Sequence, residues 1–400
     1  MPDESLSEFH ASPIPPVEIT RQENIWFLHP GYPAPCNILL SLPRVDQTAH
    51  HTFGIHHKTA LTACQIIGNN AFETGRFCHD KDGQQPVTVP LDEALTDSTY
   101  YFLVDNGASK YPIVPSFQDW EFPHGRIPDT WRLPSLFSDA STSRCGITNF
   151  SICTEEAHIV PKEEVHWYLR NGMSQYGRDL GDIDDSANLL SLRSDIHKCF
   201  DNRWLVIVPK VAGGGGTFDT DTSSRSARYV SHILSRRAAE YWPTYHNTVV
   251  QYIENESGPY LFARFAWAVL LLVKAFVTSG YPRHVIRVQE LTDVEDIETA
   301  WKEELLSGAQ LRASYSGGGS KSATKKRKSE LLEEEDDLAE SSEDSNIGMG
   351  SDIWDNVMDE WEARGQRRKQ ISSETAPEII AEDGTAQEKV AHLKSGSLEM

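Results

Sequence analysis

The sequence contains few cysteines, no long apolar segment and no excess of positive charge. Its six cysteines include no CxxC pair and are too sparse for a disulfide scaffold. The longest apolar run, Phe265–Val273, covers nine residues, whereas a membrane-spanning helix needs about 20. Acidic side chains outnumber basic ones by 59 to 37, a formal charge of −22, which excludes a protein that coats nucleic acid non-specifically. We therefore expect no membrane association, and contact with nucleic acid only through a local surface.

The first residues also lack a targeting signal of the secretory type. MPDESLSEFH is acidic and has no apolar core, so we expect no signal peptide. Together with the low cysteine content, this favours an intracellular, reducing compartment. A basic run, Lys325–Lys328, suits a nuclear import signal. The alternative is an ordinary solvated charge run in a cytoplasmic protein.

The composition changes several times along the 400 residues, which exceed one ordinary domain. The hydrophobic fraction of 39% and the mean hydropathy of −0.46 indicate that part of the chain adds nothing to a core. Residues 321–400 hold 20 acidic and 11 basic side chains, a composition that cannot fold by itself. We predict an α+β fold made of a disordered arm (1–22), a β-rich N-terminal module (24–137), a compact unit (138–210), a flexible loop (211–223), a helical extension that packs on the compact unit (224–287) and a mostly disordered acidic tail (288–400).

Hydrophobic periodicity predicts the main helices and strands. Aromatic and β-branched runs between turns that contain glycine or proline indicate strands in the N-terminal module. Apolar residues at helical spacing predict helices over residues 59–72, 192–200, 227–241 and 260–277. The last of these is apolar nearly all round, so it must be buried. Residues 204–208 are rich in β-branched side chains and predict a strand.

The compact unit contains polar residues at defined spacing. His158 ends a strand-like segment, and Asn188 follows it by thirty residues. His197 follows Asn188 by nine residues and precedes Asp201 by four. Residues i and i+4 of a helix share a face, so the His197 imidazole and the Asp201 carboxylate would project together. Such a pair is a two-ligand platform for a divalent cation.

These residues lie in the segments RCGITNFSICTEEAHIVP and DIDDSANLLSLRSDIHKCFDNRWLVIVP, which resemble the HNH endonucleases, a family with the ββα-metal fold. The likeness is to a subgroup found in larger fungal proteins, with an AHIVP element followed by NLL and DIHK.FD. It covers residues 144–210, and the flanking stretches extend it over most of residues 24–280. The resemblance implies a metal-dependent endonuclease that hydrolyses nucleic acid, with DNA preferred by family habit, and leaves 5′-phosphate and 3′-hydroxyl ends. It also implies one divalent ion, Mg²⁺ or Mn²⁺, with Zn²⁺ as the other candidate.

The resemblance assigns roles to the matching positions. His158 would be the general base, since an imidazole titrates near the working pH, and Asn188 would hold the loop and the base in orientation. Asp182, Asp184 and Asp185 are expected to form a solvated loop, with a metal ligand as the alternative. The implied site residues are catalytic (His158, Asn188, His197), metal-binding (His197, Asp201) or substrate-binding (Arg193, Lys198).

Two other functions remain open. Many family members carry Asp or His just before the general base, where this chain has Ala157, and strand alternation points Glu156 with His158 but Glu155 away from it. A catalytically inactive HNH fold that binds nucleic acid or protein is therefore one alternative. The other is an interaction protein that recruits partners through its acidic tail, where the apolar residues of 353–361 could form a partner-binding helix.

Overall fold

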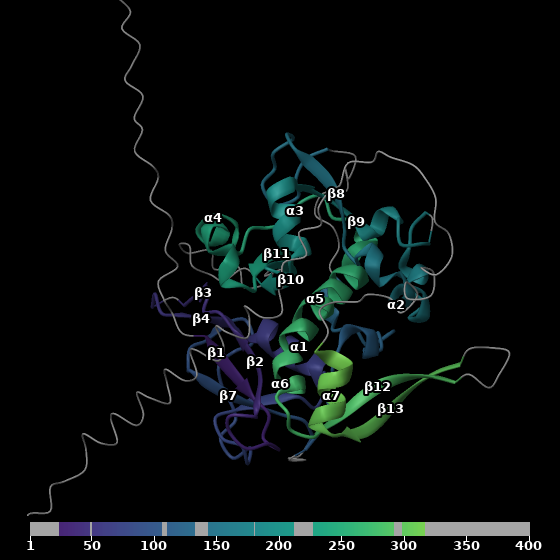
Figure 1. Cartoon of the computed structure of the whole chain (residues 1–400). Coiled ribbons are helices and arrows are strands. Elements are labelled where there is room, and N and C mark those ends of the chain that lie inside the picture. The colour runs from purple at the N-terminus through teal and green to yellow at the C-terminus, as the bar shows by residue number, and fades with distance from the viewer. Residues whose placement is uncertain are drawn as a thin grey trace, which may run out of the picture. The chain divides into compact units, whose positions relative to one another are not determined.

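The computed structural model describes residues 24–48, 50–105, 110–132, 143–179, 181–211, 227–291 and 298–316. These residues form helices and several small sheets, which confirms the predicted α+β class (Figure 1). All of them belong to one compact unit, Met1–Ala323. The predicted N-terminal arm, most of the loop 211–223, the basic run Lys325–Lys328 and the segment 353–361 lie outside the described residues.

The N-terminal strands are β1 (Ile25–Leu28), β2 (Ile38–Leu42), β3 (Asp46–Gln47), β4 (Phe53–His56), β5 (Arg76–Cys78), β6 (Ala94–Leu95) and β7 (Thr99–Leu103). They form one sheet of order β2-β1-β7-β5, in which only β1 and β7 are parallel, and one of order β3-β4-β6. Helix α1 (His57–Ile67) follows β4 directly and ends at Gly68. It confirms the helix predicted over residues 59–72, although it stops earlier.

The middle of the chain is a hairpin followed by a helix and a strand. Its elements are β8 (Thr154–His158), α2 (Val165–Arg170), β9 (Leu189–Arg193), α3 (Ser194–Asp201) and β10 (Leu205–Val211). Strands β8 and β9 are antiparallel, with His158 opposite Leu189 and Thr154 opposite Arg193. The strand predicted over 204–208 is confirmed by β10. The helix predicted over 192–200 begins later, because Leu192 and Arg193 complete the ladder with β8.

The helix predicted over residues 227–241 is wrong. The segment begins instead with β11 (Ala227–Ile233), which is antiparallel to β10, and continues with a 3-10 helix over Arg236–Tyr241. Its apolar residues satisfy a helical period, but β10 offers an edge, and pairing satisfies the backbone hydrogen-bonding groups of both strands. The hydrophobic periodicity of one segment does not show whether a strand elsewhere in the chain will pair with it.

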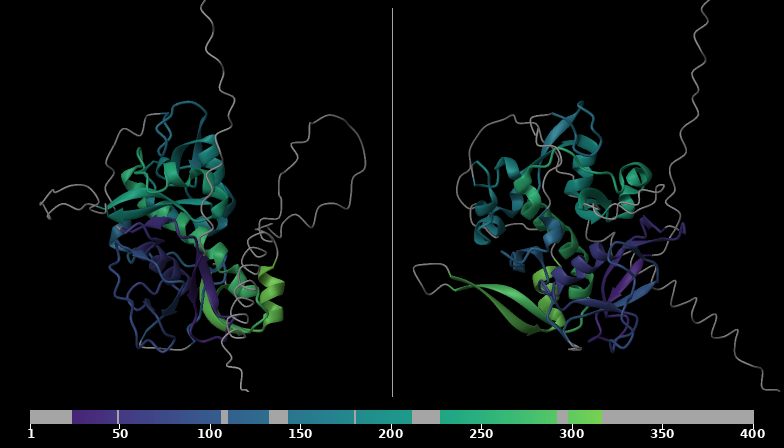
Figure 2. Two further views of the ribbon diagram at one scale, coloured as in Figure 1. Left: turned by 90° about the vertical axis from the view of Figure 1, so that its left-hand side faces the viewer. Right: turned by 180° about the vertical axis from the view of Figure 1, so that it is seen from behind.

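Regular structure extends beyond residue 288, where the composition predicts a mostly disordered tail. Strands β12 (Arg283–Leu291) and β13 (Glu298–Leu306) form a long antiparallel ribbon, and helix α7 (Gly308–Tyr315) follows (Figure 2). Trp301 Nε1 donates to the backbone oxygen of Asp119, and the Tyr315 hydroxyl donates to its carboxylate. Contacts with the N-terminal half thus stabilise a segment that is too polar to form a core of its own.

Helices α5 (Gly258–Leu272) and α6 (Lys274–Thr278) confirm the predicted burial of residues 260–277. Helix α5 packs against α1 of the N-terminal half and against β10 of the middle segment (Figure 1). The segment Asn255–Thr278 is long and apolar enough to cross a membrane, but 72% of its apolar window is buried inside the protein. Such burial is typical of a core helix. The three regions predicted to fold share one hydrophobic core.

Candidate functional site

The first histidine of the motif, His158, is the last residue of β8 and pairs with a carboxylate. Its Nε2 lies 2.8 Å from Asp184 Oδ1, and Lys162 Nζ lies 2.7 Å from the same oxygen. A carboxylate only accepts hydrogen bonds, so Nε2 carries the proton and Nδ1 presents its lone pair. None of the described residues hydrogen-bonds to Nδ1. The imidazole is therefore held in the tautomer that can accept a proton at Nδ1.

Asp182 and Asp184 of the acidic loop are exposed, as predicted, and Asp184 also pairs with His158. The hydrogen bond from Lys162 and that from His158 lower its pKa, so the carboxylate is ionised at neutral pH. The neighbouring Asp185 is fully buried. Its carboxylate accepts hydrogen bonds from the backbone N–H groups of Arg178, Asp179, Gly181 and Ala187. The loop is a defined structure that places Asp184 against His158.

Asn188 is fully buried and connects the exit of β8 with the acidic loop. Its Oδ1 accepts from the Val160 N–H at 2.7 Å, and its Nδ2 donates to the backbone oxygens of Val160 at 3.1 Å and Ile183 at 2.8 Å. The side chain therefore ties the residues after His158 to the loop that carries Asp184. This geometry suits the orienting role that the resemblance implies.

The second histidine, His197, lies in α3 between two carboxylates. Its Nδ1 is 2.7 Å from Glu155 Oε2, and its Nε2 is 3.2 Å from Asp201 Oδ2. The hydrogen bond with Asp201 raises the pKa of His197, burial opposes this, and Glu155 adds to the increase. Burial alone would raise the pKa of Asp201, but His197 and the charge of Arg264 lower it instead.

The pair formed by His197 and Asp201 fits a divalent cation. Adjacent ligands of an octahedral ion, each about 2.1 Å from the metal, lie about 3 Å apart. His197 Nε2 and Asp201 Oδ2 are separated by 3.2 Å, so the two atoms are already close to ligating distance. Glu155 holds the other ring nitrogen, as a carboxylate behind a metal-binding histidine commonly does. The predicted i, i+4 platform is present, with a further carboxylate behind it.

The alternation of side chains along β8 assigns no role to Glu155, but in the structure Glu155 contacts His197. Glu155 points away from His158, and the side to which it points is the face that α3 covers. Ala157 shares this face of β8 and is fully buried. Glu155, two residues before Ala157 on this face, is thus the carboxylate of β8 that meets His197 of α3. The alternation of side chains along β8 predicts that Glu155 and His158 point to opposite faces. Only the packing of the structure shows which of these faces α3 covers.

The two predicted phosphate contacts have different surroundings. Arg193 donates to both carboxylate oxygens of Asp195, at 2.6 and 2.7 Å, and its guanidinium lies over the rings of Phe150 and Tyr245. Its charge is committed to this ion pair, which argues against the predicted contact with phosphate. Lys198 is exposed on α3, and its ammonium forms no ion pair with a described residue. Lys198 is therefore the better candidate for a phosphate contact.

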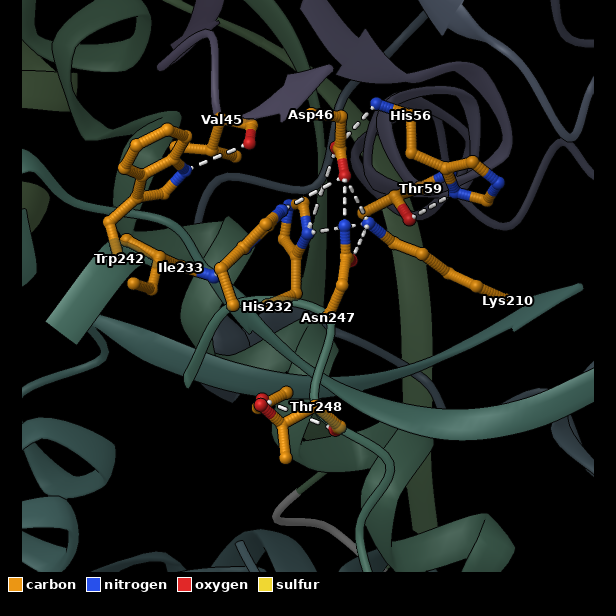
Figure 3. Close-up of polar contacts among 12 residues, drawn as sticks. Val45, Asp46, His56, Thr59, Lys210, His232, Ile233, Trp242, Asn247 and Thr248 are labelled. Atoms are coloured by element: carbon orange, nitrogen blue, oxygen red, sulfur yellow. Dashed lines mark hydrogen bonds and ion pairs between the residues drawn. The ribbon is translucent and has the colours of Figure 1, made fainter. Parts of the chain in front are cut away.

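A second polar group is buried between the N-terminal half and the β10–β11 pair (Figure 3). Asp46 Oδ1 lies 2.6 Å from Lys210 Nζ and 2.9 Å from His246 Nε2. The Lys210 ammonium also lies 3.1 Å from His232 Nδ1 and 2.8 Å from Asn247 Oδ1. Among the described residues, the ligand atoms of Asp46, His232 and His246 lie within 4.8 Å of one another, a separation that suits a metal ion.

The Lys210 ammonium lies beside two of these three ligand residues, Asp46 and His232. Burial alone would raise the pKa of Asp46, but Lys210 and His246 lower it instead, so Asp46 and Lys210 form an ion pair. Two unit charges 4 Å apart interact by about 4 kcal/mol at an effective dielectric constant of about 20, and a divalent ion would roughly double this repulsion. The cluster therefore holds its own cation. The pair His197 and Asp201 remains the candidate metal centre.

Mild acid is expected to destabilise the protein through its buried neutral histidines. Burial lowers the pKa of His29 and His56 to about 3 and also lowers those of His57, His232 and His246. A histidine with a depressed pKa contributes stability that is present above its unfolded pKa, about 6.5, and is lost as the pH falls toward the folded value. From about pH 7.5 to about pH 5.5, His29 and His56 should each lower the free energy of unfolding by about 1.4 kcal/mol, measured by urea unfolding.

His197 acts in the opposite direction, because a raised pKa contributes stability that is lost as the pH rises. It therefore opposes the effect of the five buried histidines. Between pH 7.5 and pH 5.5, the His29→Gln variant should show a mean slope of unfolding free energy against pH that is smaller by about 0.7 kcal/mol per pH unit. The exposed His50 provides the control, and His50→Gln should keep the parent's slope. Equal slopes in the parent and in His29→Gln would contradict a buried neutral His29.

Residues 144–208 match the family model described as HNH endonuclease. The matched residues contain β8, β9, α3 and both histidines of the candidate site. No curated protein and no solved structure matches the chain significantly. The match supports an HNH domain in this part of the chain and, with it, nuclease chemistry on nucleic acid and the divalent metal that HNH nucleases generally use. The narrower likeness to fungal proteins stays a prediction.

Proposed function

We propose that the chain is a metal-dependent endonuclease that hydrolyses phosphodiester bonds of nucleic acid, with His158 as the general base and His197 as a metal ligand. The observation that carries the proposal is the pairing of each histidine with its own carboxylate, Asp184 for His158 and Glu155 for His197. Asp184 fixes the tautomer of His158, and Glu155 holds Nδ1 of His197, which leaves Nε2 of His197 beside Asp201 Oδ2. Both pairs lie within the residues that match the HNH model.

His158 supplies the proton transfer in this proposal. With its Nε2–H held by Asp184, Nδ1 accepts a proton from the attacking water, and the ionised carboxylate stabilises the imidazolium that forms. Lys162 keeps Asp184 ionised. Asn188 holds the residues after His158 in place through its bonds to Val160.

His197 Nε2 and Asp201 Oδ2 would hold the divalent ion, and Glu155 would keep the proton on His197 Nδ1. When bound, such an ion stabilises negative charge on the scissile phosphate and on the leaving 3′ oxygen. Protonated His197 cannot ligate, so acid weakens binding. Lys198, exposed on the same helix, supplies a contact with a phosphate of the substrate.

The proposal extends to substrate, products and compartment. DNA as substrate, with 5′-phosphate and 3′-hydroxyl products, follows from the resemblance to HNH endonucleases. Import into the nucleus rests on Lys325–Lys328, and recruitment of a protein partner rests on the tail 321–400. Deleting residues 321–400 separates recruitment from cleavage, because a nuclease without this tail keeps cleaving whereas an interaction protein loses its associations.

An inactive HNH fold is the second candidate, and Ala157 is the feature that favours it. The two candidates differ in metal binding, because an inactive scaffold binds no divalent ion through His197. Calorimetric titration of the full chain with Mn²⁺, beside His197→Ala, decides between them. Binding that is lost in the variant supports the metal centre, and equal heats in both proteins support the scaffold.

Cleavage of plasmid DNA and of RNA by the purified full chain, in EDTA, Mg²⁺, Mn²⁺ and Zn²⁺ separately, tests the proposal directly. Metal-dependent cutting that is lost in His197→Ala is the expected result. Cutting that persists both in EDTA and in the variant would indicate a contaminant. A folded chain that cuts neither nucleic acid with any metal would refute the nuclease proposal.

Replacing Asp184 by asparagine is expected to lower kcat by about 10–100-fold and to change KM little. The neutral amide no longer stabilises the imidazolium that forms on His158, whereas the substrate contacts are unaltered. Single-turnover cleavage at saturating metal measures the effect. Asp179→Asn is the matched control, because this carboxylate lies in the same loop but accepts from the Ser186 hydroxyl at 2.9 Å. The same kcat in both variants would contradict a role for Asp184.

A further inference from the structure

Arg264 is a buried cation on α5, outside the residues that match the HNH model. Its side chain is 1% exposed. The guanidinium carbon lies 3.8 Å from the centroid of the Phe200 ring and 4.5 Å from a ring centroid of Trp267. Arginine stays charged in proteins, so this otherwise apolar helix places a positive charge in the core.

The donors of Arg264 reach two elements of the candidate active site. Nη1 lies 3.2 Å from the backbone oxygen of Ile159 and 3.5 Å from that of His158. Nη2 lies 2.5 Å from the backbone oxygen of Phe200 and 3.3 Å from Asp201 Oδ1. The first two acceptors are at the end of β8, and the other two are at the end of α3. One planar group therefore spans the strand that ends in the general base and the helix that carries the metal ligands.

The two carboxylate oxygens of Asp201 have different partners as a result. Oδ1 faces Arg264 Nη2, and Oδ2 faces His197 Nε2. The Asp201 side chain is 53% exposed, so its orientation depends on these contacts with Arg264 and His197. Arg264 thus leaves one defined oxygen of Asp201 beside His197.

We propose that Arg264 is a positioning residue of the nuclease site, which fixes the spacing between His158 and His197 and orients Asp201 toward the metal position. The inference rests on the proposed function, because it gives Arg264 a part in that reaction. Packing alone does not require a charge here. An apolar side chain of similar volume fills such a space without the desolvation penalty of a buried ion.

Arg283 of β12 offers a matched control. It is fully buried, and its guanidinium carbon lies 4.2 Å from the Tyr32 ring centroid and 3.6 Å from that of Phe276. It donates to the backbone oxygens of Phe276 and Cys36. Arg283 thus shares the burial, the aromatic stacking and the carbonyl partners of Arg264, but these partners all lie outside the candidate site.

The test compares Arg264→Met, Arg264→Lys and Arg283→Met in the full chain. At saturating Mn²⁺, and per folded molecule, we expect kcat of Arg264→Met to fall by about 10-fold or more with little change in KM. Arg283→Met should keep the parent's kcat. Lysine at position 264 keeps the charge but reaches fewer of the four acceptors, so an intermediate kcat is expected. Equal kcat in Arg264→Met and Arg283→Met would overturn the inference.

A second readout does not depend on cleavage. Mn²⁺ bound through His197 broadens the NMR signals of nearby histidine rings, and the effect falls steeply with distance. The ratio of broadening at His158 to that at His197 should change in Arg264→Met and stay at the parent's value in Arg283→Met. An unchanged ratio in Arg264→Met overturns the positioning role, whatever the parent cleaves. A parent that cleaves nothing, combined with the expected change in ratio, refutes the nuclease proposal and leaves the positioning role standing.

Discussion

Replacing His158 by alanine is expected to lower kcat for nucleic acid cleavage by about 10²–10⁴-fold. The variant removes the nitrogen that accepts the proton of water, and His197 is not free to replace it, because it is held between Glu155 and Asp201. The metal ligands are untouched, so Mn²⁺ affinity should stay close to that of the parent. Single-turnover cleavage and calorimetric titration with Mn²⁺ measure the two quantities separately.

Two further variants serve as controls for His158→Ala. His166, an exposed residue of α2, is the matched control, and His166→Ala should cleave like the parent. His197→Ala should lose both cleavage and Mn²⁺ binding, since it removes a ligand. A His158→Ala variant that cleaves like His166→Ala would disprove the assignment of the general base. One that loses Mn²⁺ binding would move His158 into the metal centre.

Replacing Lys210 by methionine is expected to lower the free energy of unfolding by about 3–5 kcal/mol. The side chains of Lys210 and Asp46 are 10% and 9% exposed, so the variant leaves a buried carboxylate without its cation. The neutral imidazoles of His232 and His246 do not compensate for a full charge. Urea unfolding of the full chain at neutral pH measures the loss.

Two controls distinguish the effect of leaving the Asp46 carboxylate unpaired from the effect of losing the packing of the Lys210 side chain. Lys302 pairs with Glu304 at 3.9 Å and is 62% exposed, so Lys302→Met should change stability by about 0.5 kcal/mol or less. Adding Asp46→Asn to Lys210→Met removes the orphaned charge and should recover part of the loss. A Lys210→Met variant as stable as Lys302→Met would show that the buried pair is not a strong structural contact.

Local patterns are sufficient for much of the candidate site. The i, i+4 spacing of His197 and Asp201 places both on one face as soon as α3 forms. The strand-like segment before His158 and the apolar character of residues 260–277 likewise need no distant partner to be recognised. Order and spacing of the motif residues sufficed to place both histidines and Asn188 in the region that matches the HNH model.

Other features depend on which element lies opposite. Residues 227–241 satisfy a helical period, and the edge of β10 makes their first part a strand. Alternation along β8 shows that Glu155 points away from His158, but only the packing of α3 shows that it meets His197. A period describes the faces of an element and carries no information about what covers each face.

The sequence by itself determined which residues carry the proposed chemistry, and the tertiary structure decided which charges hold them in place. Asp184 reaches His158 across 26 residues, Arg264 reaches Asp201 across 63, and Lys210 reaches Asp46 across 164. The sequence does not show which partner any of these charges has. The reason is physical: a buried or paired charge is stabilised by its partner, and no local pattern encodes a partner that lies so far along the chain.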